Sequence, residues 1–179
     1  MDNLNFSPIE SSRFLMNIHR ASLSTFKASE IKNHIIENNV DVLILRLPSS
    51  SIATHSNLQN TGFDIIHADS LVYYKSNLEA TEVNLLKNKL NFVQIDLLNS
   101  KKLNEIIPII FKNYQNHYFS NPFLNKEKII EGYIEWAKKY SGIEKGKISW
   151  LIYSEDEIAG FATCSFNEQA KECEGVLYG

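Results

Sequence analysis

The C-terminal stretch of the chain, residues 147–179, reads KISWLIYSEDEIAGFATCSFNEQAKECEGVLYG. Apolar and polar residues alternate along three runs, which span Lys147 to Ser154, Ile158 to Asn167 and Glu172 to Tyr178. Alternation with a period of two is typical of strands that bury one face. The polar segments between the runs are as short as the turns that join neighbouring antiparallel strands. We therefore expect three consecutive antiparallel strands here.

The residues before this stretch predict one strand followed by two helices. The apolar run 92–98 has the length and composition of a strand. Residues 100–111 and 126–140 repeat apolar side chains at helical spacing, and the aromatic-rich segment 116–123 is expected to be a loop between them. Residues 92–179 therefore have the order strand, helix, helix, strand, strand, strand.

The first 78 residues predict a compact layer of helices and strands. Strand patterns occur at residues 12–24, 40–47, 63–67 and 70–75, and helical patterns precede the second and the third of these. The order β-α-β-α-β-β predicts an α/β layer. We therefore expect an α/β fold with mixed α+β sheets in two parts, residues 1–78 and 92–179, joined by a polar linker, residues 79–91.

The composition excludes several classes of function. A net charge of −3 with scattered lysines offers no surface for nucleic acid. The chain has neither a signal-peptide pattern nor an apolar stretch long enough to span a bilayer, so we expect a cytoplasmic protein without membrane contact. Cys164 and Cys173 fit reduced thiols of that compartment, although a disulfide between them stays open. The histidines lack metal-ligand spacing, so no metal site is expected.

The order of elements in residues 92–179 resembles the first half of the acyl-CoA-dependent N-acetyltransferases of the GNAT superfamily. The hairpin from Trp150 to Thr163 looks like the family's second and third strands, and residues 175–179 look like the end of its fourth. Further similarity, to nucleotide-sugar N-acetyltransferases of the dTDP-fucosamine type, lies in the segments Asn116–Pro122, Glu135–Ala137 and Leu58–Phe63. The resemblance implies a partial GNAT-like fold preceded by a degenerate GNAT-like α/β domain.

That resemblance implies transfer of an acetyl group from acetyl-CoA to the amino group of a small acceptor, such as a nucleotide-linked amino sugar. The fourth strand would pair with the pantetheine arm of the cofactor, and a carboxylate would take the proton of the amine. The implied residues are Glu172 and Glu174 for catalysis, Gly175, Val176, Leu177 and Tyr178 for the cofactor, and His117, Tyr118, Phe119 and Asn121 for the acceptor. The alternative is that the two glutamates are charges on the surface of a strand and that the residues of the loop fill the space between a helix and the sheet.

The sequence departs from the family pattern at one point. No Gln/Arg-x-x-Gly-x-Gly/Ala motif, which cradles the pyrophosphate of the cofactor, occurs in the 179 residues. We therefore expect the chain by itself to bind acetyl-CoA weakly or not at all and to be inactive, as a truncated form of its parent enzyme would be. The alternative is a non-catalytic binding or assembly module with a GNAT-like sheet, in which two copies pair as a homodimer through the open edge at residues 176–178.

Overall fold

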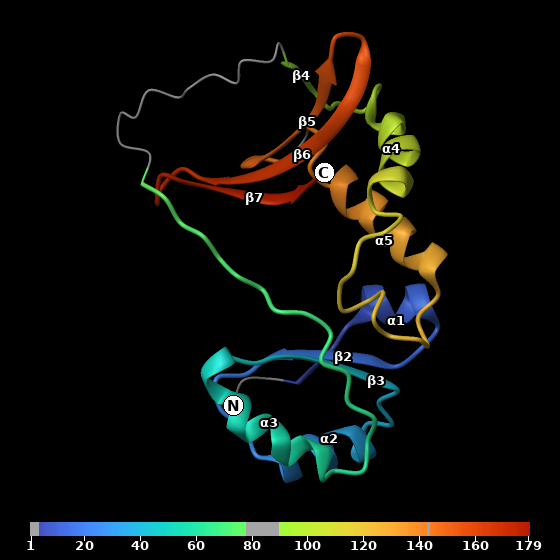
Figure 1. Ribbon diagram of the computed structural model, residues 1–179, viewed down its shortest axis with the longest axis vertical. Helices are drawn as coiled ribbons and strands as arrows, with labels where there is room; N and C mark the ends of the chain where they lie inside the picture. The colour runs from blue at the N-terminus through green and yellow to red at the C-terminus, as the bar shows by residue number, and fades with distance from the viewer. Residues whose placement is uncertain (1–3, 78–89, 143) are drawn as a thin grey trace. The chain divides into compact units, whose positions relative to one another are not determined.

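The structure, a computed structural model, describes residues 4–77, 90–142 and 144–179, and for residues 51–55 it describes the backbone alone. It is a mixed α/β fold with two sheets, and the chain divides into two compact units (Figure 1). Unit 1 consists of the residues up to Ala68 together with Ser120–Asn125. Unit 2 consists of Asp69–Phe119 and Lys126–Gly179.

Unit 1 is built on a three-stranded sheet. β1 (Asn5–Phe6) pairs antiparallel with β2 (Ile18–Ser22), and β2 pairs parallel with β3 (Val42–Arg46). α2 (Ala28–Glu37) forms the crossover that a parallel pair requires. The other elements are α1 (Pro8–Phe14), the 3₁₀ turn η1 (Ser49–Ser51) and α3 (Ile52–Gln59). The buried core of this unit contains Ala21, Leu23, Ile31 and Leu58.

The strand predicted at residues 12–24 is wrong in its first part, because α1 extends to Phe14. Pro8 occupies the first turn of this helix, where its missing N–H leaves no helical bond unmade. The helix ends at Leu15, whose φ of 55° is left-handed. The alternation read from the sequence therefore spans a helix end, and β2 begins only at Ile18.

The two strands predicted at residues 63–67 and 70–75 are also wrong, because both segments are coil. Their apolar side chains are exposed, from 37% at Phe63 to 93% at Tyr74. A strand exists only where its backbone groups find a partner in a ladder. In the part of the chain that is described, no strand pairs with either segment.

Unit 2 contains a four-stranded antiparallel sheet with the strand order β4-β5-β6-β7. The three strands predicted from the C-terminal stretch are confirmed as β5 (Lys147–Ser154), β6 (Glu157–Asn167) and β7 (Glu172–Tyr178), each antiparallel to the next. β4 (Leu90–Gln94) pairs with β5 and begins within the predicted linker, whose residues 79–89 lie outside the described part. β4 ends before residue 98, because Asp96 Oδ1 accepts the backbone N–H groups of Leu98 and Asn99 and turns the chain.

Two helices connect β4 to β5 and cover one face of this sheet (Figure 1). They are α4 (Leu103–Ile110), which follows the 3₁₀ turn η2 (Ser100–Lys102), and α5 (Lys126–Lys138). Phe111, at the end of α4, stacks on Tyr133 of α5 with ring centroids 4.6 Å apart and also lies near the Phe161 ring of β6. Phe161 is fully buried, so this aromatic cluster joins both helices to the sheet. No helix of the described residues is both long and apolar enough to cross a bilayer.

A pair of histidines links β2 to α2 in unit 1. His34 Nε2 and His19 Nδ1 are 2.9 Å apart, so one ring donates a hydrogen bond to the other. His19 is buried, and the Phe6 ring packs against it edge to face. Burial lowers the pKa of His19 below its ordinary value of 6.5, and the neighbouring His34 lowers it further. The folded chain therefore resists protonation of His19.

We expect unit 1 to lose stability as the pH falls below about 6.5, because there the unfolded chain binds a proton at His19 that the folded chain does not. Thermal unfolding followed by circular dichroism between about pH 8 and pH 5 measures this dependence. His19→Gln should flatten it. His67→Gln, which changes an exposed histidine, should leave it as in the parent chain. Equal slopes in both variants would refute the role given to His19.

The aromatic cluster of unit 2 leads to a second prediction. Phe161→Ala should lower the free energy of unfolding by about 3–5 kcal/mol, because it leaves a cavity between the sheet and both helices. Phe92→Ala on β4 is the matched control, since Phe92 is 54% exposed, and it should cost less than about 0.5 kcal/mol. Urea denaturation measures both, and a comparable loss in the two variants would contradict this description of the core.

Candidate functional site

The outer edge of β7 is the first feature of the candidate site. β7 is the last strand in the order of its sheet, so in the described residues only β6 pairs with it. Phe161 and Gly179 exchange both backbone hydrogen bonds, at 2.8 and 3.1 Å, directly after β7. In an antiparallel ladder, the residue that follows or precedes a hydrogen-bonded pair directs its N–H and C=O away from the neighbouring strand. The backbone groups of Tyr178 therefore face the open edge.

The same argument applies at the other end of β7. The N–H of Phe166 donates to Gly146 on the side of β6 that faces away from β7, at 2.7 Å. Phe166 is paired with Cys173, so the backbone groups of Cys173 also point outward, and with a period of two those of Gly175 do as well. The outward positions are thus Cys173, Gly175 and Tyr178.

A β-bulge explains why these positions are separated first by two residues and then by three. The register between β6 and β7 shifts between Thr163 and Cys164, which leaves Val176 as the extra residue of β7. Beside the bulge, the hydroxyl of the fully buried Thr163 accepts the N–H of Leu177 at 2.9 Å and donates to the Leu177 carbonyl at 3.0 Å. The hydroxyl therefore adds two hydrogen bonds to the strand pairing between Thr163 and Leu177.

The residues predicted to hold the cofactor occupy this bulged half of β7. Gly175 and Tyr178 contribute outward backbone groups, and the Tyr178 side chain is 70% exposed. Val176 is half-buried, and Leu177 packs in the core with only 8% of its surface exposed. The four residues thus offer a backbone edge with one aromatic ring beside it.

The two glutamates predicted to be catalytic lie in the other half of β7. Glu172, opposite Asn167, forms an ion pair with the Lys75 ammonium. Glu174, opposite Ser165, is exposed. Both carboxylates are therefore surface groups at some distance along the strand from Tyr178, and their role as the base stays a prediction.

The predicted acceptor residues divide between the two units. His117, Tyr118 and Phe119 belong to unit 2, whereas Asn121 belongs to unit 1, where its side-chain oxygen accepts the N–H of Phe123. The His117 and Tyr118 rings lie against each other with centroids 4.0 Å apart. The structure therefore keeps three of the four residues together.

Asp69 holds His117 in place. One carboxylate oxygen, Oδ2, lies 3.0 Å from His117 Nδ1 and 3.1 Å from the backbone N of the same residue. Both partners are partly exposed, so this arrangement is a partly solvated ion pair when His117 is protonated. A carboxylate on Nδ1 sets the ring orientation and the tautomer of an imidazole. Sequence analysis missed Asp69, because 48 residues separate the partners.

Asn116 organises the neighbouring loop. Its side-chain oxygen accepts the backbone N–H groups of Tyr118 and Phe119, at 2.9 and 3.0 Å, and its amide nitrogen donates to the Tyr133 hydroxyl of α5. Burial is the main reason that the pKa of Tyr133 is raised, and Tyr114, Tyr118 and Asp69 raise it further. Tyr133 therefore stays neutral and accepts the Asn116 amide. Asparagine often accepts the backbone N–H groups of the residues two and three positions after it and so forms a turn. Asn116 is therefore a signal for this turn that can be read from the sequence.

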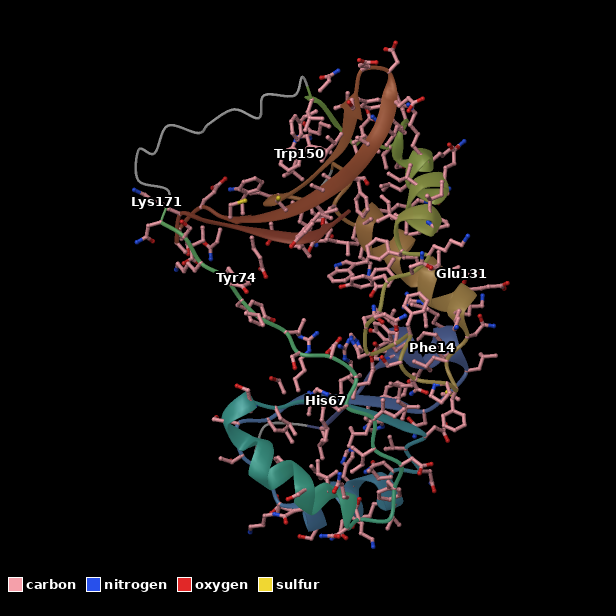
Figure 2. The ribbon with its side chains drawn as sticks, viewed as in Figure 1. Phe14, His67, Tyr74, Glu131, Trp150 and Lys171 are labelled. Carbon is pink, nitrogen blue, oxygen red and sulfur yellow. The ribbon has the colours of Figure 1, made fainter. Side chains whose placement is uncertain are left out.

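The two cysteines share the sheet face that the helices leave uncovered, and Figure 2 shows Trp150 on that face. Cys164 and Phe166 are two residues apart on β6 and therefore lie on the same face, and Cys173 joins them because it is paired with Phe166. Both thiols are free, and burial together with the neighbouring Cys173 raises the pKa of Cys164 to about 11. In the described residues no group of three or more His, Cys, Asp or Glu side chains is arranged to hold a metal ion.

No protein-family model, curated protein or solved structure matches the chain.

We expect Thr163→Val to lower the free energy of unfolding by about 1–2 kcal/mol, because it removes the two hydrogen bonds that the buried hydroxyl makes with the backbone of Leu177. Thr163→Ser keeps the hydroxyl and should recover most of this loss. Hydrogen exchange at the Leu177 amide, read by NMR, should speed up in the valine variant alone. Similar exchange in both variants would contradict a hydrogen bond from the Leu177 amide to the hydroxyl.

Proposed function

We propose that unit 2 is part of an acyl-CoA-dependent N-acetyltransferase that moves an acetyl group from acetyl-CoA to the amino group of a nucleotide-linked amino sugar. The observation that carries the proposal is the bulged, open edge of β7, with outward backbone groups at Gly175 and Tyr178. The pantetheine arm of coenzyme A contains two amides. An arm of this kind pairs with an open strand edge as a short added strand does.

The topology of unit 2 supports the same proposal. An antiparallel sheet in sequential order, with two helices between its first and second strands, agrees with the GNAT-like order expected from the sequence. The helices cover one face of the sheet, and in the described residues no strand pairs with the outer edge of β7. The free thiols agree with the cytoplasm, where acetyl-CoA is available.

The proposed reaction needs an electrophile held in place and a route for one proton. The amine nitrogen attacks the thioester carbonyl carbon, the C–N bond forms, the C–S bond breaks, and sulfur leaves with the electron pair and takes up a proton. The outward N–H of Tyr178 is suited to stabilise the oxygen that becomes negative during this attack. Glu172 and Glu174 remain the carboxylates predicted to accept the proton of the amine.

The acceptor side of the proposal rests on the loop around His117. Its ring is oriented by Asp69, and Tyr118 presents a second ring beside it. An imidazole and a phenol side by side give a sugar or base both a hydrogen-bonding group and a stacking surface. Phe111 connects this loop to the sheet through its contacts with Tyr133 and Phe161.

A non-catalytic assembly module is the second candidate, and the exposed edge of β7 is the observation in its favour. In such a module a second copy would pair with β7 to form a homodimer. The bulge at Val176 weakens this candidate, because a strand of a second copy would match the outward groups of Cys173 and Gly175 but would be out of phase at Tyr178. Sedimentation analysis separates the two: a stable dimer favours the module.

The proposal predicts how residues 1–179 respond to S-acetylpantetheine, which carries the arm without the nucleotide. We expect weak binding, with a Kd above about 1 mM, and NMR shifts concentrated at the amides of Gly175 and Tyr178. Acetyl-CoA should bind no more than about tenfold more tightly, since the sequence lacks the pyrophosphate motif. The valine variant of Thr163 should weaken the shifts, and the serine variant should not. Shifts that avoid β7 would overturn the proposal.

A further inference from the structure

A segment with the properties of a strand lies beside the beginning of the open edge of β7. This segment, Asp69–Lys75, is coil, and we call it the strap. Its apolar residues Leu71, Val72, Tyr73 and Tyr74 are 54–93% exposed. Branched and aromatic side chains of this kind favour strands. In the described residues of unit 2, therefore, no strand pairs with the strap and none pairs with the outer edge of β7.

The strap is tied to unit 2 at both ends. At one end Asp69 contacts His117. At the other end Lys75 forms an ion pair with Glu172, the first residue of β7, and Figure 1 shows the strap reaching the sheet there. The strap and β7 each contain seven residues. From the Lys75–Glu172 contact the strap runs back to Asp69 while β7 runs on to Tyr178, so the two segments would pair antiparallel.

The ion pair also sets the register of this pairing. With Lys75 opposite Glu172, Tyr74 is opposite Cys173 and Val72 is opposite Gly175. Cys173 and Gly175 are two of the residues whose backbone groups point outward, so each would exchange hydrogen bonds with its partner in the strap. Lys75 and Glu172 would then be a non-hydrogen-bonded pair, whose side chains lie closest together and suit an ion pair.

The faces of the sheet agree with this register. Cys173 shares the uncovered face with Phe166, which is 42% exposed, and Tyr74 opposite Cys173 would join that face. Figure 2 shows Trp150 on this face and Tyr74 on the strap. Because of the bulge at Val176, the strap and β7 can pair in register only as far as Gly175. The part of the strap before Val72 leads instead to Asp69, which contacts His117.

We propose that the strap docks on β7 as a fifth, reversible strand of the sheet in unit 2, in the register Tyr74–Cys173 and Val72–Gly175. The structure holds the undocked form, with both end contacts already made. Docking gains the free energy of a few backbone hydrogen bonds and loses the conformational entropy of a few residues. Because these opposing contributions are similar in size, the strap can both dock and detach. The docked strap covers Cys173 and Gly175 and leaves Tyr178 open.

Docking of the strap does not depend on the proposed enzyme activity. Its consequence for a ligand does rest on that activity: the docked strap and a pantetheine arm would compete for the backbone groups of Gly175. The strap would then act as an internal inhibitor of the edge, and its end contacts would keep it near the edge while a ligand is bound.

Disulfide trapping tests the register. Cys164→Ser leaves Cys173 as the one native thiol of the 179 residues, and Tyr74→Cys then adds its proposed partner. Oxidised glutathione takes two electrons and two protons from the thiol pair. We expect an intramolecular disulfide that forms at least about tenfold faster than in the matched control, Tyr73→Cys with Cys164→Ser, whose new thiol points to the other face. Equal rates, or no disulfide in either chain, would overturn the proposal.

Proline substitutions provide a test without cysteines. The N–H of Val72 points to β7 in the proposed register, whereas that of Leu71 points away. In the parent chain the amides of Cys173 and Gly175 should exchange hydrogen more slowly than unprotected amides. Val72→Pro should abolish this protection, and Leu71→Pro should preserve it. Both positions are exposed coil, so neither change disturbs the fold. Unprotected amides in the parent chain would contradict docking, whatever the outcome with S-acetylpantetheine.

Discussion

The backbone ladder between β6 and β7 is the interaction on which unit 2 depends. On the sheet face that the helices cover, β6 carries Phe161, which anchors the aromatic cluster of both helices, and Thr163, whose hydroxyl makes two hydrogen bonds with the backbone of Leu177. At the outer edge, the ladder leaves the backbone groups of Cys173, Gly175 and Tyr178 without a strand partner in the described residues. A hydrogen-bonding edge attached to a packed core is rigid in position and still open to a partner. This combination underlies both the proposed cofactor contact and the docking of the strap.

The bulge in β7 determines what kind of partner the edge can accept. A regular strand edge presents outward groups at every second residue and pairs readily with any other strand. In β7 the interval changes at Val176, so a regular strand matches at most one half of the edge. The half before the bulge matches a short segment such as the strap. The half after it, at Tyr178, suits a ligand with few amides.

The strands of unit 2 could be predicted from the sequence because each carries its own signal. Between Lys147 and Tyr178 the alternation is local and the turns are short, so neighbouring strands pair without help from distant residues. The strand predicted around Phe14 failed, because Pro8 and the left-handed Leu15 define a helix whose end imitates alternation. The strand predicted at residues 70–75 failed for a different reason: its propensity is real, but a strand also requires a partner edge.

Local pattern was enough to establish the element types of residues 147–179, the aromatic loop near His117 and the position of the candidate edge, because periodicity and turn chemistry act between near neighbours. The rest depended on contacts between residues far apart in the chain. Asp69 meets His117 across 48 residues, and Asn116 meets Tyr133 of α5 only after the loop has folded back. The outward direction of the backbone at Gly175 and Tyr178 follows from the register with β6. Such contacts arise from packing and from the pairing of buried polar groups, which no run of neighbouring residues encodes.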